Sequence, residues 1–214
     1  MFFMLPSLID FILHIDTHLD AIVSAYPTLS YLLLFFIIFI ETGVVVMPFL
    51  PGDSLLFVVG ALSALGSLNI FSVFLIMFFA AVLGDTVNYH IGKSVGPHVF
   101  RAKSSWFFNK EHLFRAQEFY NKHGKKTIVI ARFVPIVRTF APFVAGIGDM
   151  KYRDFFAYNV IGALLWCGLF IIGGFFFGNI PWVQDNFGTF ILAIIFLSLM
   201  PLVIELIRGL VKKR

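Results

Sequence analysis

The sequence predicts an all-α integral membrane protein, and three observations lead to that fold class. Of its 214 residues, 59% are hydrophobic and only 13% are charged, a balance outside the range of soluble domains. Apolar runs cover 70–91, 155–178 and 189–207, and each has about the length that one bilayer crossing needs. Two more apolar stretches, 29–66 and 127–149, are interrupted by prolines and charges. We therefore expect a single membrane domain, 1–214, built from transmembrane helices and two broken helical elements.

The positions of Lys and Arg predict which side of the membrane each loop faces. Residues 1–92 contain neither type although they contain several acids, and every basic side chain lies in 93–214. Because basic loops stay in the cytoplasm, we expect a multi-pass protein with a cytoplasmic C-terminus and a basic cytoplasmic loop at 93–126. A helix near 110–123 would lie on anionic lipid. With this hydrophobicity, nucleic-acid binding is the weaker explanation of the basic loop, so we expect no nucleic-acid partner.

Residues 1–26 are predicted to contain an amphipathic helix that lies in the membrane interface. Leu8, Phe11 and Ile15 recur at helical spacing, and acidic side chains occupy much of the other face. His14 and His18 are four residues apart and could share a metal ion, but no third ligand follows in a recognisable motif. We therefore predict no metal site and no cofactor.

The first broken element, 29–66, places two acids inside an apolar region. Its initial apolar run ends at Glu41, and Asp53 follows beyond Pro48 and Pro51. Proline removes a backbone donor and breaks a helix, which a membrane tolerates only where the broken backbone is buried in protein or lines a cavity. The pattern predicts a re-entrant element that returns to the side from which it entered.

The second broken element, 127–149, carries Arg132 and Arg138 in an otherwise apolar run, with Pro135 between them. A charge at the bilayer centre costs roughly 2.5 kcal/mol or more, so such residues usually face a partner or a wet cavity. Charge and helix breaker together predict a re-entrant segment that forms a binding site. The alternative is an interfacial helix whose arginines snorkel. The loop charges make the two broken elements enter from opposite faces, the pattern of inverted-repeat transporters.

Four stretches of the chain resemble the DedA family of bacterial inner-membrane proteins, which is related to the VTT-domain lipid scramblases. They are ETGVVVMPFLPGDSLLFVVGAL (41–62), GDTVNYHIGK (84–93), FYNKHGKKTIVIARFVPIVRTFAPFVAG (119–146) and YNVIGALLW (158–166). The resemblance implies a transporter or flippase that supports envelope integrity. Some members return undecaprenyl phosphate across the membrane, and others are linked to resistance that depends on the proton motive force. It places the family's functional acids at Glu41 and Asp53 and its functional arginines at Arg132 and Arg138.

The chemistry of these four side chains suits a lipid phosphate. Arg132 and Arg138 can hold phosphate oxygens bidentately and keep their charge in a low dielectric. Glu41 and Asp53 can pair with the arginines in the empty site and take up protons when phosphate displaces them. The expected partners are a membrane lipid (a polyprenyl phosphate or a phospholipid) and protons, and a homo-oligomer is left open. Alternatively, the four charges form static salt bridges between the two broken elements.

Asp85 is a third acid in an apolar segment, close to Asn88 and Tyr89. An acid inside a membrane is a functional candidate by default. Asp85 is therefore either a proton relay, which we group with the proton-coupling acids, or an interfacial cap together with Tyr89.

Two other functions compete with lipid transport. A proton-coupled cation or drug antiporter could bind its cation with the three acids, but the arginines argue against it. A membrane lipid phosphatase would need a nucleophile with a positioned base, and 127–149 offers Thr139 and no histidine. We therefore expect the protein not to be an enzyme.

Overall fold

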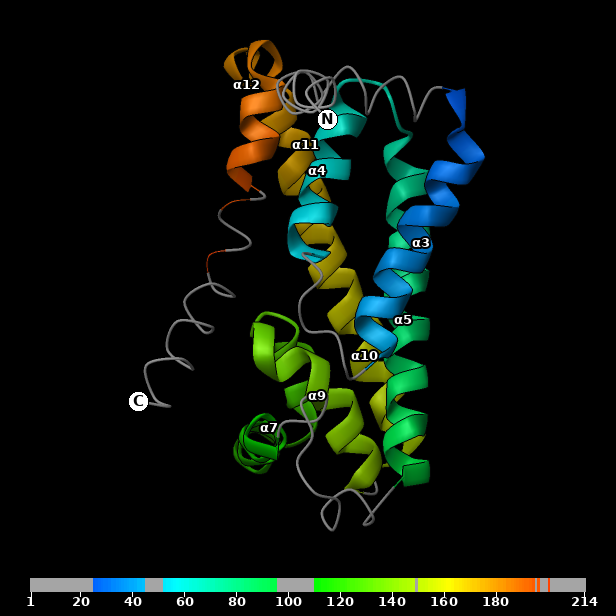
Figure 1. Cartoon of the computed structure of the whole chain (residues 1–214). Coiled ribbons are helices and arrows are strands. Elements are labelled where there is room, and N and C mark those ends of the chain that lie inside the picture. Colours follow the sequence, from blue (N-terminus) through cyan, green and yellow to red (C-terminus); the bar gives the residue numbers. More distant parts are fainter. Residues whose placement is uncertain are drawn as a thin grey trace, which may run out of the picture. The chain divides into compact units, whose positions relative to one another are not determined.

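The computed structural model describes residues 25–44, 52–95, 110–148, 150–194, 196 and 200, and Figure 1 shows their arrangement along the chain. Within these residues every regular element is helical and no strand occurs, so the predicted all-α class is confirmed. The chain divides into two compact units. Unit 1 comprises 1–33, 51–74 and 170–214, and unit 2 comprises 34–50 and 75–169.

Among the described residues, two helices are long and apolar enough to cross a membrane. One is α5 (Ile70–Val95), and the other is the continuous helix Tyr152–Gly178. The second consists of α10 (Tyr152–Cys167), a π-helical turn η2 (Gly168–Ile172) and α11 (Gly173–Gly178). Both expose large apolar side chains, as lipid contact requires: Phe79, Leu83, Leu164 and Leu165. Helices therefore lie where the spans 70–91 and 155–178 are predicted, and the prediction that they cross the membrane stays a prediction.

Unit 2 is built around α5 and the second half of α3 (Pro27–Gly43). After α5 come α7 (Lys110–His123), the 3₁₀ turn η1 (Gly124–Lys126), α8 (Thr127–Ala131) and α9 (Pro135–Ile147). α10 completes the unit. The bounds of α7 match the helix predicted near 110–123. A buried apolar cluster joins α5, α8, α9 and α10 through Tyr89, Ile128, Phe140 and Phe155.

A break at Arg132–Val134 separates α8 from α9. Val134 is extended, with φ −118° and ψ 103°, and Pro135 is the first residue of α9. Proline pushes the preceding residue out of the helical region, and it is favoured in the first helical position because its missing N–H would have no partner there. The break predicted between the two arginines is therefore confirmed. Pro142 lies inside α9 without ending it.

Helices α5 and α9 approach each other closely because two glycines lie between them. A Cβ at Gly92 would lie 2.2 Å from the Phe143 carbonyl oxygen, and one at Gly146 would lie 2.2 Å from that of Tyr89. The Tyr89 hydroxyl donates to the Met150 carbonyl and so ties α5 to the start of the segment leading into α10. These contacts fix α9, and the arginine at its start, against α5.

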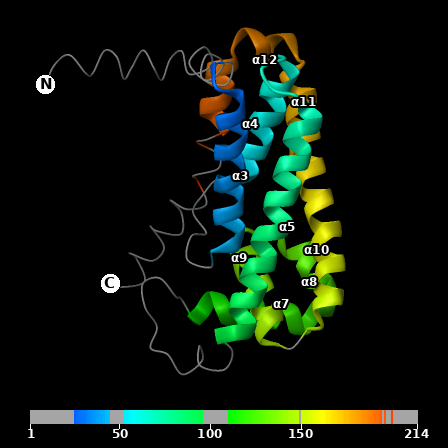
Figure 2. The ribbon, with the colours of Figure 1, turned by 90° about the vertical axis from the view of Figure 1, so that its right-hand side faces the viewer.

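Unit 1 pairs α4 (Gly52–Ala64) with α11, and the two views in Figures 1 and 2 show these helices side by side. A Cβ at Gly174 would lie 2.0 Å from the Phe57 carbonyl oxygen, and one at Gly60 would lie 2.2 Å from that of Ile171. Beyond α11, α12 (Pro181–Asp185) and residues 187–194 continue as helix. Asn69 caps α5, since its Oδ1 accepts from the Ser72 N–H at 3.0 Å.

Several predictions fall partly outside the described residues. These are most of the 1–26 helix, the interruption of the first broken element at 45–51, the 96–109 part of the basic loop, and most of 195–207. The described parts of 29–66 are α3 and α4. The re-entrant paths, the inverted repeat and the sidedness of the loops remain predictions.

Candidate functional site

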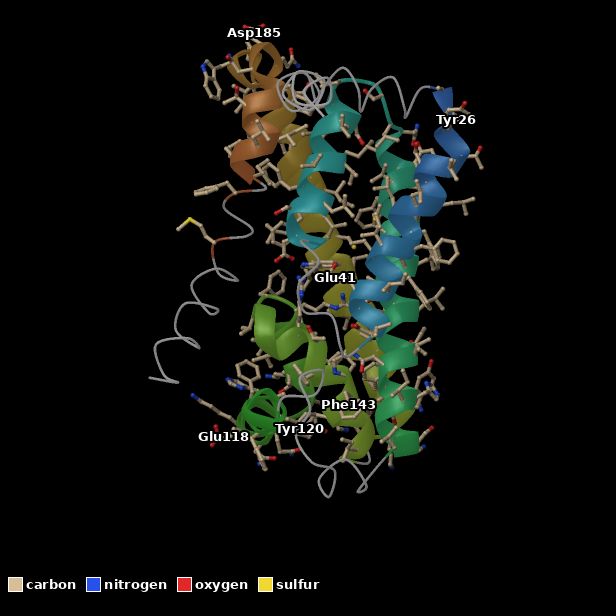
Figure 3. All side chains as sticks on the ribbon, viewed as in Figure 1. Tyr26, Glu41, Glu118, Tyr120, Phe143 and Asp185 are labelled. Atoms are coloured by element: carbon tan, nitrogen blue, oxygen red, sulfur yellow. The ribbon has the colours of Figure 1, made fainter. Side chains whose placement is uncertain are left out.

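Four of the five predicted site residues lie together in unit 2, and each comes from a different position in the fold. Glu41 lies at the C-terminal end of α3, as Figure 3 shows. Asp85 is in the middle of α5, Arg132 follows α8 in the break, and Arg138 is in the first turn of α9. The fold therefore gathers charges that are up to 97 residues apart in the sequence.

Arg138 forms an ion pair with Glu41 that joins α9 to α3. The guanidinium Nη2 donates to Glu41 Oε1. The carboxylate side chain is only 3% exposed and that of Arg138 is 14% exposed. An acid of the first broken element thus pairs with an arginine of the second, as the sequence predicted.

Arg132 pairs with Asp85, a partner that the sequence did not predict for it. Its Nη2 lies 2.5 Å from Asp85 Oδ2, and the two side chains are 5% and 7% exposed. The same nitrogen lies 2.6 Å from Asn159 Oδ1 on α10. Asp85 is therefore the counter-ion of Arg132, and Tyr89, its expected partner in an interfacial cap, donates to Met150 instead. The relay role of Asp85 stays a prediction.

Two fully buried asparagines support the ion pairs. Asn159 Nδ2 donates to the Val82 carbonyl at 3.0 Å, which fixes the amide oxygen that accepts from Arg132. Asn88 Nδ2 donates to the carbonyls of Thr42 and Thr139, at 3.1 and 2.9 Å. Those carbonyls belong to the residues that follow Glu41 and Arg138, so Asn88 joins the two chain segments that carry the Glu41–Arg138 ion pair. Asn159 was missed from the sequence, although an asparagine in an apolar span is a usable signal.

A glycine on α10 makes room for Arg132. A Cβ at Gly162 would lie 3.0 Å from both Cδ and Nε of Arg132. Within the described residues the buried Nε has no hydrogen-bond partner. The guanidinium group is therefore held through Nη2, by Asp85 and Asn159, and its Nε lies against α10 at Gly162.

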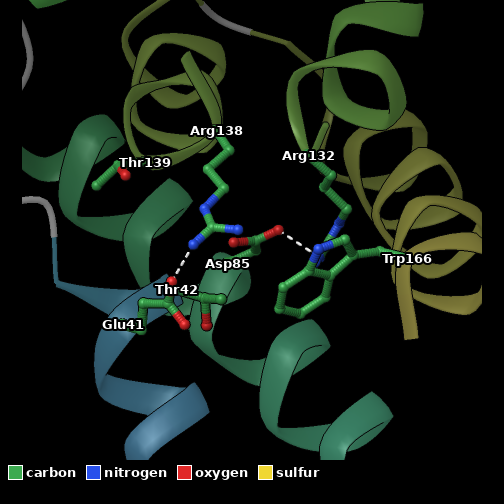
Figure 4. A pocket seen from close by; sticks show the side chains of 7 residues that line it. All are labelled: Glu41, Thr42, Asp85, Arg132, Arg138, Thr139 and Trp166. Atoms are coloured by element: carbon green, nitrogen blue, oxygen red, sulfur yellow. Dashed lines mark hydrogen bonds and ion pairs between the residues drawn. The ribbon is translucent and has the colours of Figure 1, made fainter. Parts of the chain in front are cut away.

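A small cavity lies among the paired charges, and Figure 4 shows the side chains that line it. They are Glu41, Thr42, Asp85, Arg132, Arg138, Thr139 and Trp166. Its volume is about 20 Å³, room for about one water molecule. The lining carries two guanidinium groups and two carboxylates, so when all are ionised the cavity is electrically balanced.

Trp166 contributes the aromatic wall of this cavity. The guanidinium carbons of Arg132 and Arg138 lie 5.7 and 5.5 Å from the centroid of its ring, within the range of a cation–π contact. Nothing in the sequence distinguishes this tryptophan from other aromatic residues in apolar helices.

The fifth predicted site residue, Asp53, belongs to unit 1. It lies in the first turn of α4 and is partly buried, where a carboxylate is favoured by the helix dipole. Its pairing with an arginine and its proton-coupling role remain predictions. In the described parts of the chain, no group of three or more His, Cys, Asp or Glu side chains could hold a metal ion.

The family model and the relatives that match this chain agree on one family. Residues 50–176 match the VTT domain. Protein DedA of Escherichia coli K12 is 57% identical over 203 residues, which cover 94% of this chain and 93% of that protein. An uncharacterized membrane protein of Mycobacterium leprae is 40% identical over 173 residues (81% and 78%). Inner membrane protein YqjA of Escherichia coli K12 is 35% identical over 153 residues (71% and 69%). No solved structure matches the chain.

Proposed function

This chain is a member of the VTT-domain family, the family of protein DedA, and on that premise we propose that it transports a lipid phosphate across the bacterial inner membrane. Undecaprenyl phosphate is the substrate we propose, and protons are the coupling ion. Relatives named as membrane or inner-membrane proteins support the location. The single observation that carries the proposal is the cavity lined by the buried Arg132 and the partly buried Arg138, each paired to a carboxylate from another helix.

Guanidinium groups are suited to a phosphate monoester at a membrane protein's interior. They remain charged in a low dielectric, and each can give two parallel N–H···O bonds to one anion. Arg132 and Arg138 border the same cavity, so one phosphate placed there would contact both. A neutral or cationic headgroup would find no such complement.

Charge balance supports proton coupling. In the empty site the two carboxylates neutralise the two guanidinium groups, so an added phosphate would leave uncompensated negative charge in a buried place. Burial and negative neighbours both favour the protonated form of a carboxyl group. We propose that Glu41 takes up a proton when phosphate displaces it from Arg138. Asp53 and Asp85 are the further acids we assign to proton coupling.

The size of the cavity fits such an exchange. Space for about one water molecule does not admit a phosphate group, so the substrate has to displace a side chain. We propose Glu41 as that side chain, because its partner Arg138 is the more exposed of the two arginines, at 14% against 5% for Arg132, and is therefore easier for a headgroup to reach.

For the architecture we propose the inverted repeat that the interrupted segments predict, with both broken elements re-entrant and the C-terminus cytoplasmic. Cysteines introduced at Ser104 and Gln184 test the sidedness. An impermeant reagent outside the cell should label Gln184→Cys and leave Ser104→Cys unlabelled. The reverse pattern would reject the topology.

The competing functions receive less support from the site. A cation antiporter needs acids available to its cation, but Glu41 and Asp85 are each engaged by an arginine. A phosphatase needs a nucleophile with a base. The hydroxyls that line the cavity are those of Thr42 and Thr139, and its lining contains no histidine.

The direct test is transport of labelled undecaprenyl phosphate by the purified protein in proteoliposomes, with and without an imposed pH gradient. We expect transport that the gradient accelerates. Glu41→Gln, which keeps the shape but not the titratable group, should transport without that acceleration. Absence of transport both with and without the gradient would reject the function.

A charge exchange separates a binding site from a static salt bridge. In the double variant Glu41→Arg/Arg138→Glu the ion pair can re-form with its polarity reversed. We expect folded yield to recover relative to either single variant while transport stays absent. Recovery of both would show that this pair is only structural.

A further inference from the structure

Trp166 lies beside both arginines of the site, a position that its residue type alone does not predict. It lies one residue before the end of α10, is 1% exposed, and is the largest fully buried side chain among the described residues. Its ring is within cation–π distance of both arginines, at 5.7 and 5.5 Å. Figure 4 shows the indole between the helix that carries it and the two ion pairs.

The two arginines need something besides their acids to stay near each other. Like charges repel, and the repulsion is strongest where water is excluded. Arg132 is held by Asp85 and Asn159. If Glu41 is displaced, the ion pair that ties Arg138 to α3 is broken at the moment when Arg138 has to hold the substrate. An aromatic ring attracts a cation without carrying a charge of its own, so the indole can retain Arg138 without competing for the phosphate.

We propose that Trp166 is a positioning residue of the phosphate site, which holds both guanidinium groups around one indole ring while their carboxylates exchange with substrate. The inference rests on the proposed function. Guanidinium groups are planar and weakly hydrated, which makes stacking on an aromatic ring favourable. The negative ring face also replaces part of the solvation that the arginines lose in a buried cavity.

A ring that merely fills the core would behave differently from one that positions arginines. A core-filling ring can be replaced by any apolar side chain of similar size. A positioning ring requires an aromatic face, which Phe retains in weaker form and Leu lacks. The affinities for phosphate should therefore fall in the order Trp, Phe, Leu even where the folded yields are similar.

The binding test uses purified protein in detergent and radiolabelled undecaprenyl phosphate, with undecaprenol as the uncharged control. We expect Trp166→Phe to weaken binding by a few fold and Trp166→Leu by about tenfold or more, as loss of cation–π contacts implies. The matched control is Trp182→Leu, since Trp182 on α12 is 63% exposed; its affinity should equal that of the parent. A folded Trp166→Leu protein that binds like the parent, or equal losses for Phe and Leu, would overturn the proposal.

A second readout does not depend on the Trp166→Leu variant and decides the matter if that variant does not fold. The chain has three tryptophans, so the double variant Trp106→Phe/Trp182→Phe leaves Trp166 as the sole source of tryptophan emission. Its emission should shift when Arg138→Gln removes one guanidinium charge, and shift again on addition of undecaprenyl phosphate. No change with Arg138→Gln overturns the positioning role. A response to Arg138→Gln combined with no lipid binding by the parent would reject the proposed substrate instead.

Discussion

Units 1 and 2 bury their polar groups in different ways. In the described part of unit 1 the buried polar side chains are three serines (Ser30, Ser54 and Ser63), and the helices α4 and α11 touch through glycines. The hydroxyl group of Ser63 has its hydrogen-bond partner within the same helix, because its Oγ donates to the Val59 carbonyl at 2.7 Å. Unit 2 buries Glu41, Asp85 and Arg132. One unit is held by close backbone packing and the other contains a network of charges.

The two units therefore differ in the desolvation free energy that their buried groups cost. Glycine contacts between apolar helices stabilise a membrane protein through van der Waals packing alone. Buried ion pairs offset a large desolvation penalty and are often no more stable than apolar residues of similar volume. The contact between α4 and α11 is made by close packing, and the charges of unit 2 are better explained by a task than by stability.

Removal of one charge from unit 2 should have the largest effect on folding. Arg132→Met leaves the Asp85 carboxylate buried without its cation, at a cost of about 3–5 kcal/mol. The double variant Arg132→Met/Asp85→Leu removes both charges and should recover most of that loss. The free energy of unfolding in mixed detergent measures both. A double variant no more stable than the single one would mean that the charges are needed for folding as well as for function.

A bulkier residue in the helix contact of unit 1 should have an intermediate effect. Gly174→Ala places a Cβ 2.0 Å from the Phe57 carbonyl oxygen, and overpacking of this kind costs about 1–3 kcal/mol. Gly168→Ala is the matched control, since a Cβ there meets no atom within 4 Å. Transport per folded molecule should be unchanged in both variants. Equal losses of stability would contradict the assigned role of the Gly174 contact.

Replacement of Arg138 by lysine should change stability little and transport strongly. Lysine keeps the positive charge but loses the two-pronged geometry. A lost hydrogen bond to a charged group implies transport roughly tenfold slower or more, while the folded yield stays close to that of the parent. Proteoliposome transport and folded yield measure the two quantities. Full transport by Arg138→Lys would show that charge without bidentate contact is sufficient.

The smallest effect is expected at an exposed ion pair of unit 2, outside the cavity. Lys125 Nζ lies 2.5 Å from Asp154 Oδ2, and this hydrogen bond raises the pKa of Lys125 above its usual 10.5. A raised pKa means that the stabilisation is fully present below pH 10.5 and is lost as the pH rises through the folded-state value. Lys125→Met should therefore be slightly less stable than the parent at neutral pH. The difference should vanish well above pH 10.5, and a difference that persisted there would have another cause.

The sequence was a good guide to the helices. Helices at 70–91 and 155–178 follow from the length of apolar runs and from the residues that end them, and the helix near 110–123 is predicted within the basic loop. The break at Pro135 follows from a missing N–H and from the restriction that proline puts on Val134. These are properties of short stretches of chain, so they can be read without knowledge of the neighbours.

The partners of the charges could be read only in part. The pairing of Arg138 with Glu41 agrees with the expectation that the two broken elements share their charges. Arg132 pairs instead with Asp85, and Asn159 and Trp166 join from α10. An asparagine in an apolar span marks Asn159 as a polar candidate, but nothing in the local sequence of Asn159 or Trp166 indicates that either lies against an arginine.

The sequence by itself determined that this is an all-α membrane protein of the VTT-domain family with charges placed where apolar helices break, because hydrophobicity, helix breakers and motifs are local. Tertiary structure alone decided that Asp85 is the counter-ion of Arg132, that Trp166 lies beside both arginines and that the cavity is small. Those outcomes depend on how far apart the helices lie and how each is turned about its axis. Contacts such as Gly162 against Arg132 and Gly146 against Tyr89 set both quantities, and they join residues that are remote in the chain.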